Sequence, residues 1–176
     1  MKKKGNGFTL FELLITATVI FVLTGFILAN YPSAGRGFAL KRSTNKLAQD
    51  IWQVQSKAII MERIQGSAPK GYGIYLTSST LTGYKLFADQ DSNWQWESAA
   101  DTLVEDVSLE SDVEISNLEA GGASVSVLNI VFQPPDPAVW INNSSSSSST
   151  ITLYLPTDPS KTGTIFVNSA GLITTQ

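Results

Sequence analysis

Residues 7–29 read GFTLFELLITATVIFVLTGFILA, and the rest of the chain is best interpreted outward from this stretch. From Phe8 to Ala29 the only charged side chain is that of Glu12. As a helix, a run of this length would extend about 33 Å, close to the hydrocarbon thickness of a bilayer. A basic cluster precedes it (Lys2, Lys3 and Lys4) and predicts a single-pass protein with its N-terminus in the cytoplasm and its C-terminus outside. A secretory signal peptide is the alternative, but the run is too long and no A-x-A-like site follows it.

Glu12 needs an explanation, because it lies one turn into the apolar run. A carboxylate in hydrocarbon costs at least about 2.5–3.5 kcal/mol, so it should have a partner. The simpler interpretation is a glutamate tolerated near the membrane surface. The sharper one is a carboxylate with a defined role in the membrane.

The segment Gly7-Phe8-Thr9-Leu10-Phe11-Glu12-Leu13-Leu14 resembles the prepilin cleavage motif of type IV pilins and type II secretion pseudopilins. This resemblance implies that a prepilin peptidase cuts between Gly7 and Phe8 and N-methylates Phe8, which removes residues 1–7 as a leader. In a filament of staggered helices, Glu12 of one subunit would neutralise the Phe8 ammonium of a neighbour. Pairing removes the cost that each ion would have alone in an apolar core.

The helix is expected to continue beyond the membrane. Residues 8–30 form the predicted transmembrane and assembly helix, and residues 31–65 its amphipathic continuation. Pro32 lacks a backbone donor and predicts a kink or break. Trp52 is expected in the core, and Gly66, Pro69 and Gly71 are expected to end the helix. An apolar stripe at helical spacing predicts the face that packs on the protein's own sheet: Leu40, Leu47, Ile51, Val54, Ala58 and Met61.

Residues 66–176 predict a β-rich globular domain. Two alternating runs, 73–76 and 84–87, flank Thr82-Gly83 and indicate a hairpin. Further strands are expected near 113–115, 125–132, 151–155, 164–167 and 172–174. Breaks are expected at Gly121-Gly122, 134–137, Asp158-Pro159 and Ala170-Gly171. The serine run 144–149 predicts a solvated, flexible loop.

This half resembles the minor pseudopilin H of type II secretion and the FimT-type minor pilins. The matching pieces occur in the family's order and are residues 71–76, 84–89, 130–134, 164–168 and 170–173. The resemblance implies an α+β fold, in which a long N-terminal helix packs on a C-terminal domain of two small antiparallel sheets.

Asp89, Asp91 and Asn93 place oxygen ligands at alternate positions, as at the start of a calcium loop. The pattern departs from an EF-hand, because Trp94 stands where that loop needs glycine and Ala100 where it needs glutamate. A polar turn after a strand is the simpler interpretation. A calcium site is the alternative, since some pseudopilins bind calcium.

Composition argues against several functions. The chain of 176 residues has no histidine and no cysteine, which excludes most hydrolase triads, zinc-thiolate sites and disulfides. No spacing singles out a pair of catalytic carboxylates, so we do not expect an enzyme. Residues 86–176 hold 12 acidic residues and Lys161 as the one basic residue, so we do not expect nucleic-acid binding. The acidic stretch 105–119 is interpreted as solvated surface, and docking to a basic partner is the alternative.

The sequence therefore predicts a minor pilin or pseudopilin, at or near the tip of a type IV pilus or type II secretion pseudopilus. Its role would be structural, in filament initiation or secretion, with no cofactor. The partners implied by the resemblance are the prepilin peptidase, other pilin or pseudopilin subunits and an inner-membrane assembly platform. The filament would lie in the periplasm or at the cell surface. A major pilin is one alternative, and a membrane-anchored extracytoplasmic binding protein or enzyme is the other.

Overall fold

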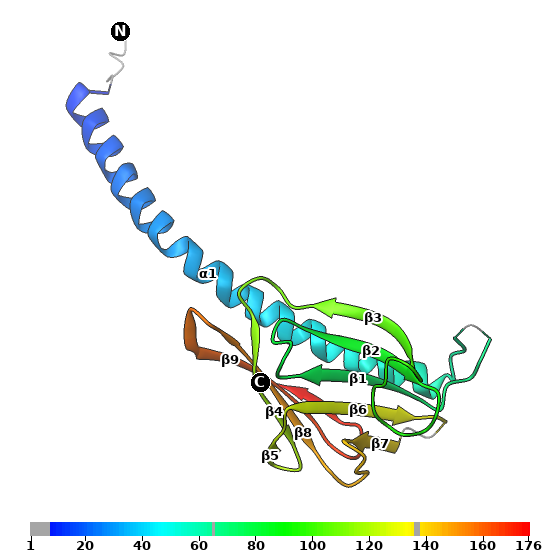
Figure 1. The fold of residues 1–176 in the computed structure, drawn as a ribbon. Helices are drawn as coiled ribbons and strands as arrows, with labels where there is room; N and C mark the ends of the chain where they lie inside the picture. The colour runs from blue at the N-terminus through cyan, green and yellow to red at the C-terminus, as the bar shows by residue number, and fades with distance from the viewer. Residues whose placement is uncertain (1–7, 65, 136–137) are drawn as a thin grey trace. The chain divides into compact units, whose positions relative to one another are not determined.

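The computed structural model describes residues 8–64, 66–135 and 138–176. These residues form one α-helix, α1 (Leu10–Ile59), and ten β-strands (Figure 1). The chain divides into two compact units, up to Arg36 and from Gly37 onward. The predicted leader, residues 1–7, lies outside the described residues, and so does its last residue Gly7 at the predicted cleavage site. Residues 136–137 of the predicted break at 134–137 also lie outside them.

The second unit contains two antiparallel sheets of five strands each (Figure 1). The first has the order β3-β2-β1-β6-β7, and the second has the order β10-β9-β8-β4-β5. The chain alternates between the sheets, because β1–β3 are followed by β4 and β5, then by β6 and β7, then by β8–β10. The strand bounds are β1 Gly71–Thr77, β2 Gly83–Asp89, β3 Thr102–Ser108, β4 Glu114–Ala120, β5 Ala123–Ser124, β6 Val127–Gln133, β7 Ala138–Ile141, β8 Ser149–Leu155, β9 Asp158–Val167 and β10 Ile173–Thr175.

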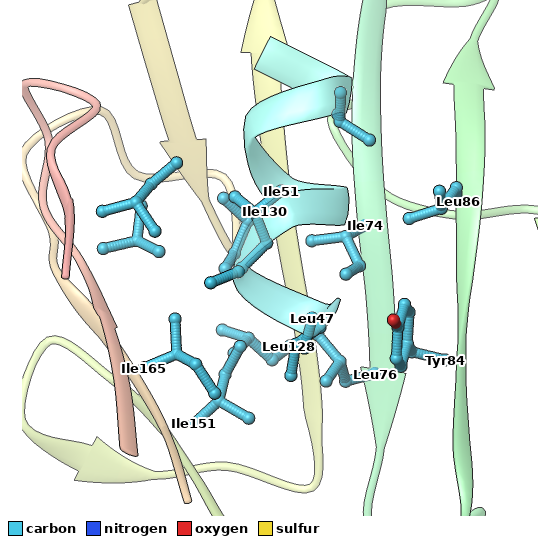
Figure 2. Close-up of a cluster of buried hydrophobic side chains, with 14 of the residues drawn as sticks. Leu47, Ile51, Ile74, Leu76, Tyr84, Leu86, Leu128, Ile130, Ile151 and Ile165 are labelled. Carbon is cyan, nitrogen blue, oxygen red and sulfur yellow. The ribbon is translucent and has the colours of Figure 1, made fainter. Parts of the chain in front are cut away.

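One hydrophobic core joins the helix to both sheets. Leu47 and Ile51 of α1 have no exposed surface and lie among side chains from β1, β2, β6, β8 and β9 (Figure 2). Five of the six positions in the predicted stripe are buried: Leu40, Leu47, Ile51, Val54 and Ala58. The amphipathic pattern therefore identified the packed face of α1 correctly.

Three expectations for the helix are wrong. The predicted break at Pro32 is wrong, because α1 runs through this residue and flanking turns can hold a helix together where a proline removes one main-chain hydrogen bond. A kink at Pro32 stays a prediction. Trp52 is 47% exposed, since it lies next to the buried stripe rather than in it. The helix ends at Ile59, before Gly66, and Met61 follows it with a positive φ of 51° and half of its side chain exposed.

The strand predictions are confirmed in outline and wrong in three details. The hairpin of β1 and β2 is present, with Ile74 opposite Leu86. Strands β3, β5 and β7 were not predicted, because β3 is a charged edge strand and β5 and β7 are very short. Asp158-Pro159 begins β9 instead of breaking the chain, and the turn lies at Pro156-Thr157. The serine run is also not a loop throughout.

Residues at both ends of the serine run belong to the folded domain. Ser144 forms a bridge with Ile141, and Ser149 is the buried first residue of β8. Polar composition alone predicted solvation, whereas pairing with β4 and β9 buries Ser149. The α+β class and the antiparallel sheets are confirmed.

Two close contacts fix α1 against the sheets. On β2, the Tyr84 hydroxyl donates to Asp50 of α1 at 2.5 Å, and Asp50 is 7% exposed. On β9, Gly163 faces Thr44 so closely that a Cβ at Gly163 would lie 2.2 Å from Thr44 Oγ1. A buried hydrogen bond thus links the helix to the first sheet. The helix approaches the second sheet closely at Gly163, which has no side chain.

Candidate functional site

The first candidate site is the apolar part of α1. Leu10–Ile27 is an 18-residue segment with a mean hydropathy of 2.3, long and apolar enough to cross a membrane. Its large side chains are exposed in the structure, with Leu10 at 84% and Phe21 at 82%. Exposed apolar patches of this kind are typical of surfaces that contact a membrane or another protein.

Glu12 and Thr9 form a capping box at the start of α1. Glu12 Oε2 accepts the Thr9 N–H and the Thr9 hydroxyl, both at 3.0 Å. In return, Thr9 Oγ1 accepts the Glu12 N–H at 3.2 Å. These bonds satisfy main-chain donors that have no partner within the first helical turn.

The capping box gives Glu12 a partner within its own chain, which the sequence interpretation had missed. The signal was visible, since threonine followed three residues later by glutamate is the capping-box pattern. Phe8, the predicted methylation site, is 81% exposed and precedes the cap residue directly. The pairing of Glu12 with the Phe8 ammonium of a neighbouring subunit stays a prediction.

The second candidate site is the loop between β2 and β3, organised by the fully buried side chain of Asp89. Asp89 Oδ1 accepts the N–H groups of Asp91 at 3.0 Å and Ser92 at 2.8 Å. Asp89 Oδ2 accepts the N–H of Trp94 at 3.1 Å. One carboxylate thus fixes the main chain over six residues, the polar turn that the sequence predicted.

Asp101 closes the same loop from its other end. Its carboxylate accepts the N–H of Gln90 at 3.1 Å and the N–H of Glu97 at 2.9 Å. Carboxylate oxygens of Asp89, Asp91 and Asp101 lie within 4.8 Å of one another. Sequence spacing did not reveal Asp101, because it lies twelve positions after Asp89 and only the fold of the loop brings the two together.

These three carboxylates are the described groups that could hold a hard cation such as calcium, which prefers oxygen ligands. Of the predicted ligands, Asp89 and Asp91 meet in this cluster. Asn93 instead accepts the N–H of Gln95 through Oδ1 at 2.8 Å and donates to Asp91 through Nδ2. The carboxylates of the loop already accept main-chain N–H groups, so a structural role explains their arrangement, and calcium binding stays a prediction.

Burial affects the acidity of this loop. Loss of solvent raises the pKa of Asp89 above its ordinary value, although N–H donors from Ser92 and Trp94 oppose the shift. Burial likewise raises the pKa of Asp101, with the charges of Asp91 and Glu97 adding to the effect. The loop therefore holds its protons to higher pH than isolated aspartates would.

A third feature is a polar groove of ≈ 610 Å³ between α1 and the end of β3. Its charges are paired within the groove, since Arg42 Nε lies 3.2 Å from Glu110 and Lys46 Nζ lies 3.0 Å from Asp50. Ser43 Oγ accepts the N–H of Glu110 at 3.1 Å. These contacts hold the β3–β4 connection against the helix.

Comparisons with models of protein families, with curated proteins and with solved structures found no match for this chain.

Proposed function

We propose that this chain is a minor pilin or pseudopilin subunit that is cut between Gly7 and Phe8 and joins a filament through the apolar part of α1. The observation that carries the proposal is the exposure of that segment together with the position of its one carboxylate. Leu10–Ile27 is apolar and exposed, and Glu12 sits in its first turn beside the cap residue Thr9. Thr9 pairs with Glu12 within the chain, and the proposal gives the Glu12 charge a second partner in the Phe8 ammonium of a neighbouring subunit.

The second unit supports a structural role. Its hydrophobic core contains the buried stripe of α1 and side chains from both sheets, so this unit forms around the C-terminal part of the helix. Lys2, Lys3 and Lys4 favour a cytoplasmic N-terminus, which places the acidic domain outside. In this proposal a membrane-inserted subunit is processed, extracted by an assembly platform and added to other subunits at or near the filament tip.

Mass spectrometry of the protein purified from its own cells tests the proposal. We expect a mature chain that starts at Phe8 and carries one added methyl group. The variant Gly7→Lys should block cutting and leave a longer, membrane-held precursor, because a large basic side chain would replace the glycine at the cleavage site. A wild-type mass equal to that of the uncut chain would overturn the proposal.

Abundance in sheared filaments distinguishes a minor from a major subunit. We expect this chain to be scarce relative to another pilin in the same preparation. If it is the main component of the filament, it is a major pilin. If it is absent from filaments but uniformly present in the membrane, the membrane-anchored binding protein is the correct alternative.

A further inference from the structure

Trp94 has a backbone conformation that bulky side chains rarely adopt. Its φ is 58°, in the left-handed region. The conformation is held by Asp89, whose fully buried carboxylate accepts the Trp94 N–H at 3.1 Å. Costly conformations of this kind persist where the surrounding structure holds them, and they concentrate at functional sites. The loop therefore fixes where the Trp94 side chain lies.

Two further contacts orient the Trp94 indole. It stacks on Trp140 of β7, with ring centroids 5.2 Å apart and planes 5° from parallel. Its edge lies over Gly71 of β1, where an added Cβ would be 3.3 Å from Trp94 Cζ3. Trp140 is itself oriented, because its Nε1 donates to Gln133 Oε1 at 3.0 Å. The indole is thus preorganised from three elements of the fold.

Trp94 lines a cavity of ≈ 280 Å³ between the α1–β1 connection, the Asp89 loop and the end of β6. Its lining includes the apolar side chains of Trp94, Ala68 and Pro69 and the polar ones of Ser92, Gln133 and Lys70. Because Gln133 accepts the Trp140 donor through its oxygen, its amide nitrogen can donate to a ligand. An aromatic wall with a few convergent polar groups is the usual construction of a small-molecule site.

We propose that this cavity binds a pyranose sugar of a glycan. A pyranose has C–H faces that pack on an aromatic ring and hydroxyl groups that pair with amide, hydroxyl and ammonium groups. Trp94 offers the ring, and Gln133, Ser92 and Lys70 offer these three kinds of partner. The volume lies just below the range of about 300–1,000 Å³ for drug-sized ligands, which suits a single ring.

The lining favours a sugar over a proline-rich peptide and over a compact anion. A proline-rich peptide needs an extended groove lined with several aromatic faces, whereas Trp94 is the one aromatic residue among those that line this cavity. A phosphate or other compact anion needs several cations or convergent main-chain donors, and Lys70 is the one cation in the lining. This proposal is independent of the assembly function.

Titrations of the full chain test the proposal. The protein is kept in a detergent without a sugar headgroup and titrated with glucose, galactose, N-acetylglucosamine and glucuronate, and it is also applied to a printed glycan panel. We expect saturable binding in calorimetry and a change in tryptophan fluorescence. Trp94→Ala should weaken binding about tenfold or more, the loss typical of an aromatic anchor. The matched control is Trp52→Ala, because Trp52 is exposed on α1 and does not line the cavity.

A second variant separates loss of the site from loss of the fold. Ala68→Phe adds a ring at an exposed lining position and should block binding while the melting temperature stays unchanged. Absence of saturable binding to every sugar and glycan would overturn the proposal. Binding that survives both Trp94→Ala and Ala68→Phe would also overturn it, as would binding of decaproline at this cavity in place of sugars.

Discussion

The hydroxyl of Tyr84 on β2 donates a hydrogen bond to Asp50 Oδ2 on α1 across 2.5 Å. Lys46 Nζ contacts the same carboxylate oxygen from one helical turn away, at 3.0 Å. Burial, and then the hydrogen bond and charge of Asp50, raise the pKa of Tyr84 far above its ordinary value, so the tyrosine stays a donor. The pair links the helix to the first sheet at the polar groove, where both Tyr84 and Asp50 are more than nine-tenths buried.

Tyr84→Phe is expected to lower the free energy of unfolding by about 1–3 kcal/mol, because it leaves the Asp50 carboxylate with one donor fewer in a buried site. Chemical denaturation of the full chain in detergent measures the loss. Tyr154→Phe is the matched control, since the Tyr154 hydroxyl donates to Glu114 at 3.1 Å near the surface and should matter less. Equal losses in the two variants would show that burial of the Asp50 pair is unimportant.

Gly163→Ala is expected to destabilise the packing of α1 on β9 by about 1–3 kcal/mol, the usual cost of overpacking a close contact. The new Cβ would lie 2.2 Å from Thr44 Oγ1 but 3.2 Å from Thr44 Cβ. Thr44→Ala removes the nearer atom, so the double variant should recover part of the loss. A double-mutant cycle measures this coupling, and strictly additive effects would contradict the contact.

Truncation of two adjacent residues of α1 should change the stability of the protein by very different amounts. Ile51→Ala should cost about 2–5 kcal/mol, because Ile51 has no exposed surface and a cavity would replace it. Trp52→Ala should change stability by about 0.5 kcal/mol or less, because Trp52 is 47% exposed. Thermal melting of the two variants measures both effects. A large loss at Trp52 would mean that the helix is rotated relative to the arrangement described above.

The Asp89 loop should become less stable as pH rises above the ordinary aspartate pKa of 3.8. Because the native pKa values of Asp89 and Asp101 are raised, the native state binds more protons than the unfolded state in this range, and stability falls as those protons leave. Amide hydrogen exchange at Trp94 and Glu97, corrected for the intrinsic pH dependence of exchange, measures the opening of the loop.

Asp89→Asn should flatten the pH dependence of loop opening, whereas Glu105→Gln on the exposed edge strand β3 should not. Asp158 has a lowered pKa, caused first by its hydrogen bond with Ser160, and its contribution is lost only as pH falls. Titration of Asp158 therefore cannot explain a loss of stability as pH rises. Opening that is independent of pH, or that decreases as pH rises, would contradict the prediction.

Glu12 and Thr9 should differ in their effects on assembly. Thr9→Val removes the hydroxyl of the capping box and should cost about 1 kcal/mol of helix stability, while the Glu12 charge remains for a neighbouring subunit. Glu12→Ala removes that charge together with the two hydrogen bonds that Glu12 Oε2 accepts, and it should sharply reduce the fraction of the chain in sheared filaments. Immunoblots of sheared and cell-bound fractions measure this. If Glu12→Ala assembles as well as wild type, Glu12 is only a helix cap.

Periodicity predicted the helix well because five of the six stripe residues needed a common buried face. It failed at Trp52 because an aromatic residue beside an apolar stripe looks the same in sequence whether it is covered or not. It failed at Met61 because the stripe continues in sequence after the main chain has left the helix at Ile59. Local pattern records which side chains are apolar, and only packing decides which of them are covered.

The sequence by itself determined the apolar segment 8–29, its single carboxylate, the packed stripe of α1 and most of the strands. These features depend on neighbours within a few residues, through hydrophobic period, turn residues and helix capping. Only the tertiary structure decided the meeting of Asp89 with Asp101, the stacking of Trp94 on Trp140 and the contact of Tyr84 with Asp50. Each pair is far apart in the chain, and sheet register and helix packing bring its members together.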